Sequence, residues 1–250
     1  MEKKLPGVFS AQKKDGTVYY RSSITHKQKH ISLGSYDTSS KAFAAYLEAS
    51  SLILDKTLSL KDYSEHRILS LAKWVSLINY RDNGIYISTP IYLHPRYLEY
   101  ILSPDLTLKF DIDDLFYYSK HKIMLRGRHF FVADYGMQVN IANRYGSKNY
   151  AVMGRDYRFV NGDPYDFRYE NIEIFNTYHG VIKKNTKKGI RYVSRIHING
   201  NYTIGTYATD TEAAIAYNKA IDILKKAGVT KNFTPNYLDG LSPSAYADLY

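Results

Sequence analysis

The chain has 250 residues, of which 44% are hydrophobic, so it can bury an ordinary globular core. It contains no cysteine, which excludes disulfides and cysteine-ligated zinc and favours a reducing compartment. The formal net charge of +10 favours a polyanionic partner, although a basic protein can also be merely well solvated. No apolar run approaches the ~20 residues that span a bilayer. The first ten residues lack the apolar stretch of a signal peptide, so we expect a cytoplasmic protein.

Residues 1–55 and 178–231 contain two copies of one sequence pattern. Three short matches occur in the same order in both copies: Gly7-Val8 with Gly180-Val181, Gly34-Ser35-Tyr36 with Gly205-Thr206-Tyr207, and Ala45-Tyr46 with Ala216-Tyr217. Twelve residues separate the glycine of the second match from the tyrosine of the third in each copy. Equal spacing of ordered matches indicates an internal repeat.

Residues 56–105 and the tail, 232–250, match neither copy. Apolar residues at helical spacing predict an amphipathic helix over Ser64–Tyr80, with Trp74 in its buried stripe. Asn83–Pro95 is predicted to form a hairpin arm, and Arg96–Leu102 a short helix. This insert either packs the N-terminal copy against the middle of the chain or exposes a surface for another protein. The tail is either docked or a contact site.

The C-terminal copy is the easier one to interpret. Alternating apolar and polar residues over Tyr192–Ile198 predict a half-buried strand. Asn199–Asn201 predict a hairpin turn in which Gly200 takes a positive φ, followed by a return strand over Tyr202–Tyr207. Thr209–Glu212 then fits a capping box at the start of a helix. Each copy is therefore predicted to be a three-stranded sheet packed on one helix.

Alternation also assigns the two faces of each predicted sheet. In the C-terminal copy we expect four side chains on the helix side: Tyr192, Ser194, Ile196 and Ile198. Four are expected on the opposite, outward side: Arg191, Val193, Arg195 and His197. In the N-terminal copy the outward positions are Tyr19, Arg21, Ser23 and Thr25.

The segments YTIGTYAT and TEAAIAY, within residues 202–217, resemble the Apetala-type DNA-binding domain of plant ethylene-response factors and phage homing endonucleases. The resemblance covers residues 179–228, and the N-terminal copy shares it through ISLGSYDTSSKAFAAY. It implies that the outward sheet face enters the major groove of double-stranded DNA, with Arg191, Arg195 and His197 as readers. Four lysines in the preceding loop are expected to contact phosphates: Lys183, Lys184, Lys187 and Lys188.

The N-terminal copy has fewer cations on its outward face. Its DNA-binding candidates are Arg21, Lys27 and Lys29, with Lys13, Lys14 and His30 as further phosphate contacts. Because Arg21 is the one cation among the outward positions, we expect weaker binding or another role for this module. For the cations of the C-terminal copy, the alternative interpretation is a solvated sheet face.

Residues 106–177 resemble the HNH homing endonucleases, in which an Apetala-type domain often follows directly. The resemblance is carried by Asp111–Leu115 and by RFVNGDPYDFRYENIEIFN, residues 158–176. It implies that Phe159 occupies the position of the general-base histidine, Arg158 that of a metal ligand and Phe167 that of the orienting asparagine. Among these catalytic positions, only Asn171 keeps the residue that the motif implies. A phenylalanine cannot accept a proton and a guanidinium repels a cation, so we expect no catalytic residues, metal or cofactor.

The other polar residues of this motif have more than one interpretation. Asp163, Asp166, Arg168 and Asn171 are expected to hold turns, and Arg168 is also a candidate DNA contact. Arg158 either binds a DNA phosphate or has drifted after the nuclease chemistry was lost. An unorthodox nuclease site built from His129 with Asp163 and Asp166 is the remaining alternative.

The expected fold class is α+β. Sheet-and-helix modules at 1–55 and 178–231 flank the insert at 56–105 and a degenerate ββα (HNH-like) hairpin domain at 106–177, with a tail at 232–250. We expect a nuclease-inactive DNA-binding protein, such as a regulator encoded by a phage or mobile element and acting in the bacterial cytoplasm. The alternative is a phage interaction protein that binds and inhibits a host protein such as a defence nuclease. The oligomeric state stays open.

Overall fold

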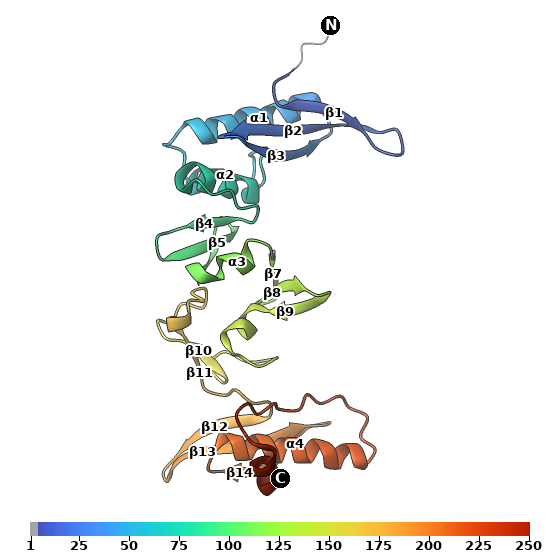
Figure 1. Ribbon diagram of the computed structural model, residues 1–250, viewed down its shortest axis with the longest axis vertical. Coiled ribbons are helices and arrows are strands. Elements are labelled where there is room, and N and C mark those ends of the chain that lie inside the picture. The colour runs from blue at the N-terminus through green and yellow to red at the C-terminus, as the bar shows by residue number, and fades with distance from the viewer. Residues whose placement is uncertain (1–4) are drawn as a thin grey trace. The chain divides into compact units, whose positions relative to one another are not determined.

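The computed structural model describes residues 5–250. Within them the fold is α+β, as the sequence predicts, with five small antiparallel sheets and five α-helices (Figure 1). Most of the sheets have three strands. Among the described residues, no helix combines the length and the apolar character that crossing a bilayer requires.

The described chain divides into two compact units. The first contains the described residues up to Leu125 together with Val132–Met137 and Tyr165–Arg168. The second contains Arg126–Phe131, Gln138–Pro164 and Tyr169–Tyr250. Between residues 125 and 169, successive segments of the chain belong alternately to the two units. Neither unit is therefore one continuous stretch of sequence in this region.

The first unit begins with a three-stranded sheet packed on one helix (Figure 1). The elements are β1 (Val8–Gln12), β2 (Val18–His26), β3 (Lys29–Tyr36) and α1 (Ser39–Leu54). Thr38 caps α1, because its side chain accepts a hydrogen bond from the backbone N of Lys41. Ala42, Ala45 and Ala49 are fully buried, and these small side chains let the helix lie close to the sheet.

Helix α2 (Leu71–Asn83) begins later than the predicted start at Ser64. The side chain of Ser70 caps it by accepting from the backbone N of Lys73, so Ser64–Leu69 precede the helix. Trp74 is fully buried, as predicted, in a core that α1, α2 and β3 share. Of the two roles left open for the insert, this part packs on the N-terminal module.

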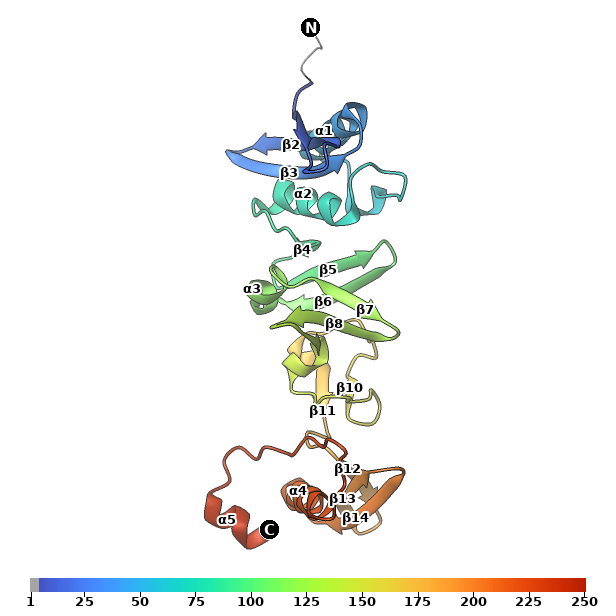
Figure 2. The same cartoon turned by 90° about the vertical axis from the view of Figure 1, so that its right-hand side faces the viewer.

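Residues 96–102 are not the predicted short helix but form most of strand β5. The strands β4 (Ile91–Leu93), β5 (Tyr97–Ser103) and β6 (Leu106–Asp111) make one antiparallel sheet, drawn in green in Figure 2. Leu98 and Tyr100 are fully buried while Glu99 between them is partly exposed, the alternation of a strand. Strand partners on both sides satisfy the backbone of β5, which outweighs a marginal seven-residue helix.

The chain continues through short elements. They are the 3₁₀ turn η2 (Ile112–Asp114), helix α3 (Leu115–Tyr118), the strands β7 (Ile123–Arg126), β8 (His129–Asp134) and β9 (Met137–Asn140), and the 3₁₀ turn η3 (Ile141–Tyr145). The predicted hairpin follows as β10 (Tyr157–Phe159) and β11 (Ile172–Ile174), with the 3₁₀ turn η4 (Tyr169–Asn171) before β11. Between α3 and α4 the described residues contain 3₁₀ turns but no α-helix, so the helix of the expected ββα arrangement is missing there.

The second unit ends with another three-stranded sheet and helix. The elements are β12 (Val181–Thr186), β13 (Gly189–His197), β14 (Asn201–Tyr207) and α4 (Asp210–Lys226). The predicted capping box is present: Thr209 accepts from the backbone N of Glu212, and Glu212 accepts from the backbone N of Thr209.

The two sheet-and-helix modules share close backbone approaches. Gly7 and Gly180 both have a positive φ, and a Cβ on either would collide with a tyrosine of the module's helix, Tyr46 or Tyr217. A β-bulge lies at the same place in each, between Ser22 and Ser23 and between Ser194 and Arg195. Both glycines therefore occupy positions where no other residue fits without displacing the helix.

The hairpin turn of the C-terminal module differs from the prediction at Gly200. Its φ lies outside the left-handed range, and the turn closes through a hydrogen bond from Ile198 N to Gly200 O at 3.0 Å. In the N-terminal module Lys27 and Gln28 take positive φ values of 43° and 63° in the corresponding turn. Similar strand pairs are thus closed by turns of different type.

The tail is docked on the C-terminal module. Phe233 is buried in the core of this module, and Asn236 exchanges hydrogen bonds with the Asn218 side chain and the His179 backbone. Helix α5 (Pro243–Leu249) follows, and Tyr250 Oη donates to Asp222 of α4 at 2.7 Å. Of the two alternatives for the tail, docking is the one observed.

Candidate nucleic-acid interface

One face of the sheet β12-β13-β14 is covered by α4, as alternation predicts. Ile196 packs with Tyr217 and Ile221 of the helix, and Tyr192 packs against a second cluster around Ala213 and Ala214. Ser194, between them on the same face, is fully buried. The odd-numbered residues of β13 therefore lie on the face away from the helix.

The outward face combines cationic and polar side chains from all three strands. Across the strand pairs, Arg191 lies opposite Lys184, Arg195 opposite Thr203 and His197 opposite Asn201. His197 Nδ1 and Asn201 Oδ1 are 3.1 Å apart. We call the outward face of β12-β13-β14 the C-terminal sheet face.

The two arginines of the C-terminal sheet face are not held by carboxylates. Arg191 Nη1 donates to the carbonyl of Ile190 at 3.0 Å, and no acidic side chain among residues 5–250 pairs with either Arg191 or Arg195. Arg195 Nε is buried without a hydrogen-bond partner. Val193, expected to face outward, is only 7% exposed because Ile182 and Thr206 flank it across the sheet.

Lys183 and Lys184 lie in strand β12 and not in the loop that the sequence predicted. Consecutive strand residues alternate, so Lys184 shares the C-terminal sheet face with Arg191, whereas Lys183 pairs with Tyr192 on the α4 side. Both lysines are exposed, as are the other residues at this end of β12. Lys187 and Lys188 occupy the exposed turn between β12 and β13, as predicted.

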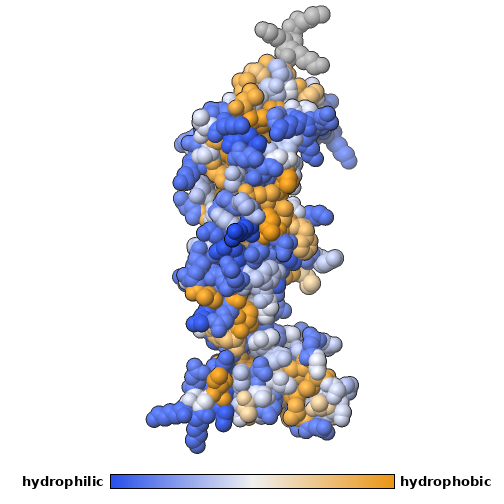
Figure 3. Space-filling model, turned by 60° about the vertical axis from the view of Figure 1, so that its left-hand side comes forward, coloured by the Kyte–Doolittle hydropathy of each residue, from blue (hydrophilic) through white to orange (hydrophobic). Residues whose placement is uncertain are grey.

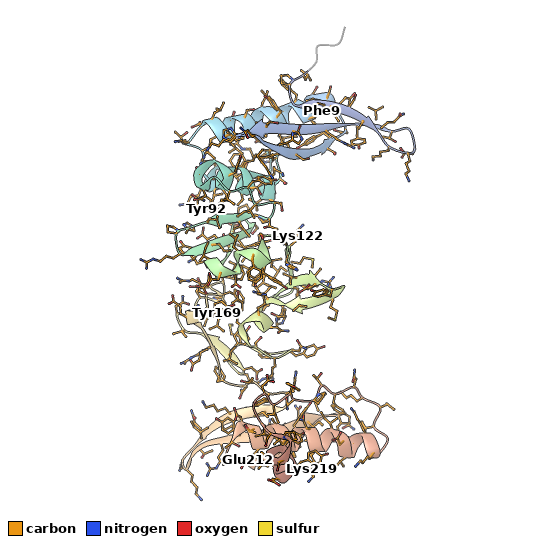
Figure 4. The ribbon with its side chains drawn as sticks, in the orientation of Figure 1. Phe9, Tyr92, Lys122, Tyr169, Glu212 and Lys219 are labelled. Atoms are coloured by element: carbon orange, nitrogen blue, oxygen red, sulfur yellow. The ribbon has the colours of Figure 1, made fainter. Side chains whose placement is uncertain are left out.

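The outward face of the N-terminal sheet is more aromatic. Arg21 donates to Tyr19 Oη at 2.8 Å and lies over the same ring, while Phe9, opposite Arg21, is 52% exposed (Figure 4). Hydrophobic side chains reach the visible surface of this module (Figure 3). Lys29 lies over the Tyr86 ring at 5.8 Å, and Lys27 is exposed in the turn. Arg21 and Lys29 thus already have aromatic neighbours.

The hairpin β10-β11 and its loop carry the residues to which the nuclease resemblance assigns the HNH positions. Phe159 is 8% exposed and Phe167 3% exposed, so both rings serve packing. Arg158 is exposed and pairs with Glu173 across the hairpin at 2.6 Å. Asn171 is buried, and its Oδ1 accepts from the backbone N of Asn161 at 2.8 Å, which is the expected turn-holding role.

Arg168 belongs to the first unit, whereas Arg158 belongs to the second. Both Nε and Nη2 of Arg168 donate to the buried carboxylate of Asp166, at 2.8 and 2.6 Å. Its guanidinium also lies over the Tyr97 ring at 5.8 Å. Arg168 therefore holds a loop, as the turn interpretation expected. Its Nε and Nη2 groups are already bonded to the Asp166 carboxylate.

No three His, Asp or Glu side chains of residues 5–250 form a group that could hold a metal ion. His129, Asp163 and Asp166, the members of the alternative nuclease site, are therefore not brought together as such a group. His129 lies in β8, while Asp166 forms a β-bridge with Lys109 of β6.

A buried polar network that the sequence did not predict connects the hairpin segment with β12. Lys148 Nζ pairs with Asp156 at 3.0 Å and donates to the carbonyl of Tyr178 at 2.8 Å. Burial lowers the pKa of Lys148, and the pairing with Asp156 partly offsets this. Burial acts to raise the pKa of Asp156, but hydrogen bonds from Arg155, Val152 N and Lys148 hold it below its ordinary value. No local pattern marks this pair, because its partners meet only in the folded chain.

Comparison of the chain with protein-family models, with curated proteins and with solved structures gives no match. Guanidinium and ammonium groups beside amide and hydroxyl groups on an exposed sheet can bind phosphates and the edges of bases. Asn201 and Thr203 were not among the predicted contacts, although alternation along β14 would have suggested an outward face for part of that strand.

Proposed function

We propose that this protein binds duplex DNA through the C-terminal sheet face and derives from an HNH homing endonuclease whose cleavage chemistry is lost. Its sheet-and-helix modules would then be Apetala-type domains, and the protein would act as a regulator of a phage or mobile element. A β-ribbon is narrow enough to enter the major groove, where arginine reads guanine and asparagine reads adenine. Arg191, Arg195 and Asn201 supply both types of side chain on one face.

The observation that carries this proposal is that Arg191 and Arg195, both partly exposed, share the C-terminal sheet face and have no carboxylate partner among residues 5–250. A structural arginine normally pairs with an acid, as Arg168 does with Asp166. Lys184 opposite Arg191 adds a third cation to the same face. Three clustered cations repel one another, and a polyanion relieves that repulsion.

The residues of the hairpin support a loss of cleavage. Phe159 is buried and carries no group that accepts a proton, so it cannot activate water. Arg158 brings a positive charge, already paired with Glu173, to the position where the nuclease resemblance implies a metal ligand. A protein with these residues lacks the groups for cleavage, so DNA binding is the activity that it retains.

The test measures fluorescence anisotropy of the full chain with a duplex that the protein itself has selected from a random library, over ~50–200 mM salt. Replacing Arg191 and Arg195 together with alanine should weaken binding by at least about 30-fold, since each base or phosphate contact contributes ~1–3 kcal/mol. A parallel incubation with Mg²⁺ checks for cleavage. The matched control replaces Lys225 and Lys226 of α4, which removes the same charge from the helix side.

Equal effects of the two double variants would show that binding reflects total charge alone and would contradict a specific sheet interface. Metal-dependent cleavage would contradict the loss of nuclease chemistry. Absence of salt-dependent binding by the unmodified protein would refute DNA binding. It would also favour the alternative of a protein that captures a host protein.

A further inference from the structure

A second cationic site lies within the second unit, on the other side of β12 from the C-terminal sheet face. It is an open cleft of about 410 Å³. The hairpin side is lined by Arg158, Glu173 and Phe175, and the sheet side by Lys183, Asn185 and Ile190. The cleft thus gathers two cations, one carboxylate and one amide from segments that are far apart in the sequence.

Arg158 is oriented in this cleft but is not saturated. Its Nε donates to Glu173 at 2.6 Å, on neighbouring strands of the hairpin. A guanidinium has five N–H donors, and no partner for the Nη groups of Arg158 exists among residues 5–250. The ion pair with Glu173 therefore fixes the plane of the guanidinium and leaves its outer edge available to an anion.

Lys183 is held next to Arg158 by the backbone. Asn176 Oδ1 accepts from the backbone N of Lys183 at 2.6 Å, and the backbone N of Asn176 donates to the carbonyl of Asp156 at 3.1 Å. The side-chain amide of Asn176 also donates to the carbonyl of Arg155. These bonds connect the hairpin segment to β12, while the ammonium group of Lys183 has no acidic partner in the described chain.

We propose that this cleft binds one phosphate of the DNA backbone, separately from the C-terminal sheet face, an assignment that rests on the DNA-binding function proposed above. Arg158 and Lys183 supply the charge, and Asn185 supplies a neutral donor. Phe175 and Ile190 give the cleft an apolar side that suits the adjoining deoxyribose. Lys183 and Lys184 then divide the work: Lys184 contacts DNA on the sheet face and Lys183 contacts a phosphate on the opposite side of the strand.

Glu173 provides a specific test of the phosphate site. Its carboxylate faces the same guanidinium that the phosphate would contact, so it competes with the phosphate for Arg158. Removing this negative charge with Glu173→Gln keeps the size of the side chain and should strengthen DNA binding several-fold. A purely structural ion pair predicts the reverse, because Arg158 would lose its partner.

The experiment uses a double variant that carries both Arg158→Ala and Lys183→Ala. Fluorescence anisotropy compares its binding with that of the unmodified protein, for the selected duplex and for random duplexes. The combined variant should weaken binding to both duplexes by the same factor and reduce the salt slope by about 0.9, the value for one phosphate contact. Lys225→Ala with Lys226→Ala again controls for the lost charge, and circular dichroism checks that each variant is folded.

An unchanged salt slope in the combined variant, or weaker binding by Glu173→Gln, would overturn the phosphate site while leaving the sheet interface intact. A loss confined to the selected duplex would also overturn it, since a phosphate contact carries no sequence information. If the unmodified protein shows no salt-dependent binding, the DNA-binding function itself fails and the phosphate site falls with it.

Discussion

Replacing Gly180 with alanine should destabilise the C-terminal module strongly, because this glycine immediately precedes β12 and lies against Tyr217 of α4. Its φ is +72°, and a Cβ would collide with the Tyr217 ring and with the carbonyl oxygen of Arg195. The carbonyl of Gly180 also accepts a hydrogen bond from Arg195 N at 2.7 Å. The substitution therefore disturbs the packing of α4 and the backbone that positions Arg195.

The size of the effect follows from two separate costs. A left-handed backbone costs a residue with a Cβ ~1–2 kcal/mol. Forcing an extra methyl group into a packed site adds ~1–3 kcal/mol. The total for Gly180→Ala is about 2–5 kcal/mol.

Two other glycines of the same module separate these costs. Gly228 has a φ of +83°, and a Cβ added there would meet no heavy atom within 4 Å, so Gly228→Ala should show the backbone cost alone. Gly200 has neither feature, and Gly200→Ala should be neutral or slightly stabilising. The expected order of destabilisation is Gly180, then Gly228, then Gly200.

Hydrogen exchange followed by mass spectrometry suits this comparison, because the single tryptophan, Trp74, reports on the first unit. Peptides covering β12 and β13 should exchange about 30-fold to several thousand-fold faster in Gly180→Ala, if they open through the destabilised state. The urea-unfolding transition reported by Trp74 fluorescence should be the same in Gly180→Ala as in the unmodified protein. Exchange in Gly180→Ala as slow as in Gly200→Ala would refute the packing argument.

Two further predictions concern the second unit. Thr209→Ala removes the N-cap of α4 and should cost ~0.5–2 kcal/mol, seen as faster exchange of the first turn of α4; exchange as slow as in the unmodified protein would contradict a capping role. Asp156→Asn leaves Lys148 buried and unpaired and should cost ~3–5 kcal/mol, whereas Asp156→Asn with Lys148→Met should recover part of the loss. Because the folded pKa of Asp156 lies below its ordinary value of 3.8, its stabilisation is complete above that pH and disappears as the pH falls through the folded pKa. Asp156→Asn should therefore flatten the acid limb of a urea-unfolding series below pH 3.8, and an unchanged acid limb would contradict this assignment.

Local patterns predicted the elements whose causes are local. The capping box at Thr209, the helix side of Tyr192 and Ile196, and the burial of Trp74 all follow from spacing within a few residues. Such patterns report which side of an element is apolar, and burying that side is the main gain in folding.

The same patterns were wrong where distant partners decide the outcome. Residues 96–102 have a composition that fits a short helix, yet strands β4 and β6 pair with them from both sides. Lys183 and Lys184 are typical loop residues, yet pairing with β13 places them in a strand. In both cases the hydrogen-bond partners of the strand belong to another segment, and the sequence of the strand itself does not reveal where that segment lies.

The sequence by itself determined the two sheet-and-helix modules, the outward position of Arg191 and Arg195, and the absence of a proton acceptor at Phe159. Tertiary structure alone decided which other polar groups share the C-terminal sheet face and which charged groups lie together in the second unit. The bulge opposite Ser194 and Arg195 shifts the alternation of β14, so Thr203 and Thr206, three residues apart, share one face. Arg158 meets Lys183, and Lys148 meets Asp156, only after the hairpin folds beside β12. Short-range periodicity can be recognised in the sequence, whereas strand register and ion-pair partners arise from contacts between segments that are far apart in the sequence.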